Sequence, residues 1–166
     1  MNKWRYTISL IVVIILQTAV VSNWTFFGIS PALSLVYLVA LSFLYGPLWG
    51  GYTGLAIGLI EDMMFSQVLG IRALLFFIAT TAVGKALYHN EHNLATGTLA
   101  TALVSLFVLA GQWGILFLLR MPLPAMYLIG KPVLFYALFN ALLFTPVMLL
   151  LKRLMRPESI RPFGRL

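Results

Sequence analysis

Cysteine is absent from this chain of 166 residues, and charged side chains are scarce. The missing cysteine excludes disulfides, thiolate metal ligands and cysteine nucleophiles. Charged residues make up only 9% of the chain, whereas a soluble domain carries about 25%. Hydrophobic residues make up 61%, so the chain has too little polar material to cover a folded surface in water. The composition therefore predicts a domain whose solvent is lipid.

Acids are the rarest charged residues, with four against eleven Lys and Arg. In a soluble protein this balance would suggest nucleic acid as a partner. Here the basic residues lie mostly at the two chain ends, which indicates a membrane surface and no nucleic acid.

Long apolar runs are separated by turn residues, which predicts an all-α integral membrane protein, a compact bundle of about six transmembrane helices. The runs cover residues 6–22, 32–45, 47–64, 72–88, 95–119 and 131–151. No A-x-A-like site follows the first run, so an uncleaved helix is expected there. The second run is short and should lie shallow or partly buried; if it is re-entrant, five helices remain. Residues 1–151 form one transmembrane domain and residues 152–166 a basic cytoplasmic tail.

The distribution of basic residues predicts the orientation. Six helices place both chain ends on one side, which would carry eight of the eleven basic residues. The other side would carry Arg72, Arg120 and Lys131. The richer side should be the cytoplasm, so we expect a multi-pass protein of the inner (plasma) membrane with both termini cytoplasmic. The tail is expected to lie against anionic lipids.

Glycine recurs at every fourth position in the third predicted helix, at Gly46, Gly50, Gly54 and Gly58. Positions four apart share one helix face, and a face without side chains lets another backbone approach closely. We predict a packing groove, either for another helix of the chain or for the helix of a partner. Gly97, near a later helix start, is expected to be less sensitive to substitution.

The next step of four reaches Asp62, with Glu61 beside it. An ionisable group near lipid needs a partner or water. Because Arg72 begins the next predicted helix, an Asp62–Arg72 ion pair is one prediction. The alternative is two solvated charges near the outer membrane surface.

Other polar groups lie inside the predicted helices. Gln17, Gln112 and Asn140 are each expected to hydrogen-bond a neighbouring helix, with lining of a substrate site as the alternative. Pro146 is expected to kink the last helix, because it removes a backbone donor.

No catalytic, cofactor or metal site is predicted. His89, Glu91 and His92 match neither H-E-x-x-H nor H-x-x-E-H spacing. On the predicted topology they lie across the hydrocarbon, about 30 Å thick, from Glu61 and Asp62.

Residues 30–74 resemble the core of the rod shape-determining MreD family. Pro31 precedes a leucine-rich helix, and a glycine-punctuated helix ends in Gly58, Leu59 and Asp62. A turn then leads into Leu-Gly-x-x-Ala-Leu, at residues 69–74. Asn140 and Pro146 resemble the Asn…Pro ending of the family's last helix. Glu61 and the pair Ser66-Gln67 depart from the family pattern.

The resemblance implies a non-enzymatic scaffold of the bacterial cell-elongation (rod) complex. Its partner would be the bitopic protein MreC, whose membrane helix would pack against the bundle. The assembly would connect MreB filaments to the peptidoglycan synthases, RodA and its partner transpeptidase.

A second hypothesis is a substrate-binding subunit of an energy-coupling-factor vitamin transporter, whose fold the MreD family is thought to share. Such subunits usually carry an A-x-x-x-A pattern on their first helix. The first helix here has only Ala19, which counts against the transporter.

Overall fold

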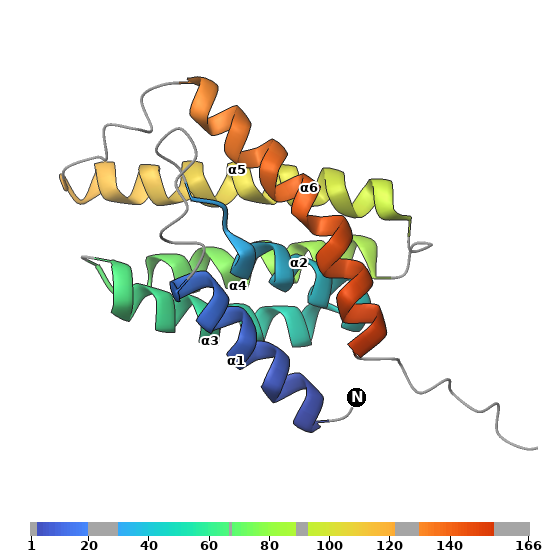
Figure 1. Ribbon diagram of the computed structural model, residues 1–166. Helices are drawn as coiled ribbons and strands as arrows, with labels where there is room; N and C mark the ends of the chain where they lie inside the picture. The colour runs from blue at the N-terminus through green and yellow to red at the C-terminus, as the bar shows by residue number, and fades with distance from the viewer. Residues whose placement is uncertain (1–2, 20–29, 67, 89–92, 122–129, 155–166) are drawn as a thin grey trace, which may run out of the picture.

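The structure, a computed structural model, describes residues 3–19, 30–66, 68–88, 93–121 and 130–154 (Figure 1). This part of the chain forms six helices and no strand. They are α1 (Lys3–Ala19), α2 (Leu33–Tyr45), α3 (Pro47–Phe65), α4 (Ile71–Leu87), α5 (Leu94–Leu118) and α6 (Gly130–Leu154). The all-helical fold is confirmed, and the predicted boundaries differ from these by at most three residues.

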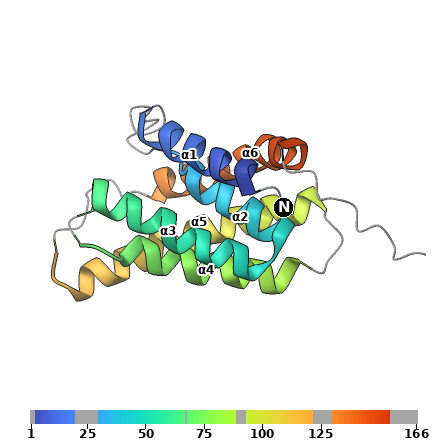
Figure 2. The ribbon, with the colours of Figure 1, turned by 90° about the horizontal axis from the view of Figure 1, so that it is seen from below.

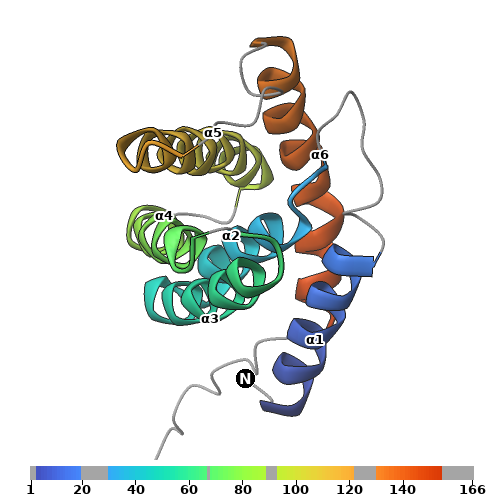
Figure 3. The same ribbon diagram turned by 90° about the vertical axis from the view of Figure 1, so that its left-hand side faces the viewer.

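The helices form two layers with α2 between them. One layer contains α3, α4 and α5, and the other contains α1 and α6 (Figures 2 and 3). The closest pairing is that of α3 with α4, which are antiparallel neighbours joined by a short turn. The helix α2 contacts all five other helices.

The position of α2 corrects the expectation of a shallow or partly buried segment. Ten of its thirteen residues, Ser34 to Phe43, are buried. A helix that is apolar on every side is suited to a core, where no face meets water. Its thirteen residues rise only about 20 Å at about 1.5 Å each, too little to cross a bilayer unaided.

Two helices are long and apolar enough to cross a membrane by length and composition, at Leu94–Leu118 and Pro132–Leu154. The apolar helices at Trp4–Ala19 and Leu33–Tyr45 are shorter. The nineteen residues of α3 include glycines and two acids, which lower its hydropathy. The outer surface is apolar, with Leu99, Leu142 and Phe117 each more than 60% exposed. A surface of this kind is suited to lipid.

The helix ends gather at two ends of the bundle. The starts of α1, α3 and α5 and the ends of α4 and α6 lie toward the right of Figure 1, while α3 and α5 end on the left. The start of α1 meets the end of α6, where the Arg5 guanidinium donates to the Leu154 carbonyl (3.5 Å). The first and last described helices therefore meet at the same end.

Candidate functional site

The glycine face of α3 lies against α4 over its second half. A methyl group added to Gly58 would lie 2.6 Å from the backbone nitrogen of Ala73. One added to Gly54 would lie 3.0 Å from the Thr80 hydroxyl oxygen and 3.1 Å from the Phe76 carbonyl oxygen. Real Cβ atoms almost never approach a backbone as closely as the first of these. The two helices therefore touch through their backbones along this face.

The first half of the face has different neighbours. A methyl group on Gly50 would meet Ser42 of α2, 2.9 Å from its Cα. The Ser42 hydroxyl donates to the Thr80 carbonyl, and the Thr80 hydroxyl donates to the Gly50 carbonyl (3.0 Å). Gly46 has a φ of +90°, which favours glycine, and separates α2 from α3. The glycine face is thus covered by α2 and α4 of the same chain.

Asp62 lies at the end of that face and caps the start of α4. One carboxylate oxygen accepts the backbone N–H groups of Gly70 (2.9 Å), Arg72 (3.0 Å) and Ala73 (3.3 Å). The other accepts the Ser66 hydroxyl (2.8 Å). The first N–H groups of a helix have no acceptor within the helix. A negative charge there also interacts favourably with the positive end of the helix dipole. The residue before α4 is Gly70, which has no side chain to cap it, so α3 supplies the acceptor.

The cap explains why residues 69–74, which resemble the MreD family, include a glycine. Gly70 has a φ of +96°, a left-handed conformation that glycine tolerates, and its N–H points at Asp62. Gly58 approaches the backbone of Ala73, in the first turn of α4. Ser66, which departs from the family pattern, adds one more donor to the same carboxylate.

The predicted ion pair between Asp62 and Arg72 is wrong, because the acid that pairs with Arg72 is Glu61. Arg72 Nη1 lies 3.3 Å from Glu61 Oε2, in the one ion pair that the described residues contain. Asp62 instead accepts a hydrogen bond from the backbone N–H of Arg72. The alternative of solvated charges is also wrong, because Glu61 and Asp62 are 4% and 0% exposed.

A second helix start is capped from other helices in the same way. The residue before α2 is Ala32, whose own N–H donates to Asn140 Oδ1 of α6 (3.0 Å). The Ser34 N–H donates to Gln17 Oε1 of α1 (3.3 Å). Asn140 also donates to the Ser105 hydroxyl of α5 (3.1 Å) and is fully buried. Asn140 and Gln17 therefore tie the start of α2 to its surroundings, as the expected bonds to neighbouring helices require.

The remaining expectations concern Gly97, Pro146, the loop 89–92 and the basic tail. Gly97 is buried, and a methyl group on it would meet the far end of the Phe144 ring, not a backbone, so its lower sensitivity stays a prediction. Pro146 lies inside α6, which continues through it; a kink there stays a prediction. The loop His89–His92 and residues 155–166 of the tail lie outside the described residues, whereas Lys152 and Arg153 belong to the last turn of α6.

Most polar groups of this region are engaged in capping and packing, whereas Glu61 Oε1 and Ser34 Oγ are buried without a hydrogen-bond partner among the described residues. Both acids of α3 have partners on α4, through a cap for Asp62 and an ion pair for Glu61. In the described ranges, no group of three or more His, Asp or Glu residues could hold a metal ion. Sequence reasoning found Asp62 and Asn140 but missed Ser66 and the capping role. An acid shortly before a turn that ends in glycine was the available signal.

The fold and this site define a helical membrane protein with an apolar exterior and a core closed by glycine contacts and buried caps. The family comparison is more specific. The chain belongs to the family of the rod shape-determining protein MreD, which matches residues 1–155. No curated protein and no solved structure matches the chain. Membership confirms the resemblance and assigns a role in determining rod shape at the membrane; the likeness to the transporter subunit fold stays a prediction.

Proposed function

We propose that the chain is a non-enzymatic scaffold of the cell-elongation complex, which binds MreC and helps couple MreB filaments to peptidoglycan synthesis. The observation that carries this proposal is the family match over residues 1–155. RodA and its partner transpeptidase would be reached through the assembly. The engagement of both Asp62 carboxylate oxygens in the cap, and the ion pair of Glu61 with Arg72, support a role by contact over a role by acid–base chemistry.

The covered glycine face favours binding of the MreC helix on the outer faces of the bundle. The glycine face offered the closest packing, but α2 and α4 already cover it. Gly46, Gly50, Gly54 and Gly58 would then support binding indirectly by fixing the shape of α3. In lipid, an added helix gains mainly from close packing and hydrogen bonds.

The proposed orientation places both termini in the cytoplasm. The end of the bundle where α1 begins and α6 ends carries Arg5, Lys152 and Arg153, and α4, which carries Lys85, ends there too. Arg72 lies at the start of α4, toward the opposite end. A reporter that works only in the cytoplasm should be active when fused to the C-terminus. Activity at that position of a reporter that works only outside the cytoplasm would overturn this topology.

The experiment for the proposed function is co-purification with a matched shape assay. A tagged chain should retain MreC in mild detergent, and its depletion should turn rod-shaped cells round. The vitamin-transporter alternative predicts retention of a coupling protein and loss of vitamin uptake, with shape unchanged. That second pattern would overturn the scaffold proposal. Genes for MreB and MreC beside this one would agree with the first pattern.

A further inference from the structure

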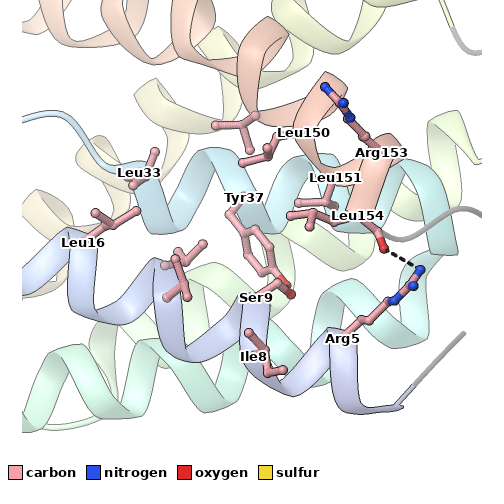
Figure 4. Close-up of a pocket in the computed structure, with 13 residues that line it drawn as sticks. Arg5, Ile8, Ser9, Leu16, Leu33, Tyr37, Leu150, Leu151, Arg153 and Leu154 are labelled. Carbon is pink, nitrogen blue, oxygen red and sulfur yellow. Dashed lines mark hydrogen bonds between the residues drawn. The ribbon is translucent and has the colours of Figure 1, made fainter.

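A groove of about 750 Å³ runs between α1 and α6 (Figure 4). Its volume lies within the range of about 300 to 1,000 Å³ that is typical of small-molecule sites. Tyr37 of α2 contributes to it, and its hydroxyl is hydrogen-bonded to the Ser9 hydroxyl of α1 (2.8 Å). The groove is lined by Arg5, Ile8, Ser9, Val12, Val13, Leu16, Leu33, Tyr37, Val147, Leu150, Leu151, Arg153 and Leu154.

The groove is open along its apolar walls. Ile8 and Val12 of α1 are 53% and 46% exposed, and Leu150 of α6 is 57% exposed. Helix α1 packs mainly on α2, and Arg5 donates to the Leu154 carbonyl of α6 at one end of the groove. An acyl chain has the shape and polarity to cover these walls.

One end of the groove is basic. Arg5 lies at the start of α1 and contacts Leu154, and Arg153 lies at the end of α6 with its side chain directed away from Arg5 (Figure 4). The described acids, Glu61 and Asp62, are occupied at α4 and leave this end without a described carboxylate. Arg5 uses one of the five N–H donors of its guanidinium in the hydrogen bond to the Leu154 carbonyl. Its remaining donors suit a phosphate, which arginine binds with paired hydrogen bonds.

We propose that this groove holds one anionic phospholipid, with an acyl chain along the α1 and α6 walls and its phosphate on Arg5. Arg153, in the last turn of α6, adds positive potential at the same end. Basic pockets between membrane helices are known to take anionic headgroups. This is a single bound molecule, separate from the general attraction of a basic tail to the membrane surface.

A partner helix fits the groove less well. Helices that dock closely in lipid use small residues at the contact. The walls here are formed by Leu, Ile and Val, and no glycine or alanine lines them. The one small residue, Ser9, is already bonded to Tyr37. The two arginines also favour an occupant with a negative charge at one end.

The test is lipid retention by the purified full chain. The chain is reconstituted in nanodiscs of equal parts phosphatidylglycerol and phosphatidylcholine, extracted in mild detergent and analysed by native mass spectrometry. We expect one retained phosphatidylglycerol per chain and little phosphatidylcholine. The double variant Arg5→Gln/Arg153→Gln should lower this retention at least fivefold. The control Arg120→Gln, an exposed arginine outside the groove, should leave it unchanged.

A second variant tests the apolar walls. Val12→Trp should fill the groove and exclude the lipid, whereas Ile11→Trp, on the same helix but outside the lining, should not. A photoreactive residue at Val12, activated in native membranes, should give a lipid adduct. Equal retention of both lipids by every variant would overturn the proposal. So would a protein adduct in place of a lipid adduct, which would assign the groove to a partner helix.

Discussion

Removing the Asp62 carboxylate should be among the most damaging single changes in this chain. Asp62→Ala deletes the acceptor of three backbone N–H groups at the start of α4 and of the Ser66 hydroxyl. The carboxylate is fully buried, so water cannot replace it without opening the turn. The change leaves the glycine contacts of α3 in place and therefore isolates the cap.

The magnitude follows from the number of donors left without an acceptor. An ordinary helix cap contributes about 0.5 to 2 kcal/mol. Each buried donor left unpaired costs about 1 to 3 kcal/mol. With three donors and partial relaxation of the turn, we expect Asp62→Ala to lower the free energy of unfolding by about 3 to 5 kcal/mol. Asp62→Asn keeps one carbonyl oxygen but loses the charge, so its loss should be about 1 to 2 kcal/mol.

The assay is SDS-induced unfolding of the purified chain in mixed micelles, with membrane abundance measured in parallel. Glu61→Gln is the matched control, because it neutralises the adjacent acid, whose described bond is one 3.3 Å contact with a partly exposed arginine. Because Glu61 is buried and only one of its carboxylate oxygens is paired, we expect its effect to be about 1 to 2 kcal/mol, below that of Asp62→Ala. If Asp62→Ala were as stable as the parent chain, or less damaging than Glu61→Gln, the capping argument would be refuted. Normal stability of Asp62→Asn with lost rod shape would instead point to a direct contact.

Two further predictions concern packing. Gly58→Ala should destabilise the chain by about 1 to 3 kcal/mol, because its methyl group meets the α4 backbone at Ala73. Gly114→Ala, which has no atom within 4 Å of the added methyl group, should be neutral or stabilising by up to about 1 kcal/mol; equal effects in thermal melts would contradict this reasoning. Asn140→Leu should cost about 1 to 3 kcal/mol by leaving the Ala32 N–H without its acceptor, and an unchanged melting temperature would count against it.

The positions of the helices were readable from the sequence because turn residues interrupt the apolar runs. Gly46 and Pro47 separate α2 from α3, and proline is favoured in the first turn of a helix. The structure begins α1 three residues before the apolar run, because the helix includes Lys3 and Arg5. Long basic side chains reach out of such a helix to the interface, so they do not end it.

The central place of α2 was not readable, and the reason is physical. In water an entirely apolar helix must be buried, but in lipid the same helix can face either the core or the acyl chains. Its run from Leu35 to Leu41 is buried on all sides, whereas α5 buries Val104 and Val108 but exposes Leu103 and Phe107. Only the packing of the other helices distinguishes the two cases.

The candidate site was readable as a set of residues but not as a set of contacts. Four-residue spacing predicted a packing face, yet nothing in the spacing says that Gly50 meets α2 while Gly58 meets α4. Asn93 shows the opposite case. Its side chain accepts the Ala95 N–H (3.1 Å), a local cap two residues away that sequence alone can supply. The cap from Asp62 crosses eight residues and a turn.

The caps supplied by other helices explain why so apolar a chain keeps polar residues inside its helices. The start of a helix exposes N–H groups, and within a membrane protein those groups need acceptors from the protein itself. A helix as short as α2 begins inside the bundle, so Gln17 and Asn140 supply acceptors there. Loss of rod shape on changing these residues would therefore reflect folding first. Residues of the proposed MreC contact should instead be sought among exposed apolar side chains, such as Leu48 and Tyr52 on α3, each 69% exposed. Changes there should lower co-purification while abundance stays normal, which separates binding from stability.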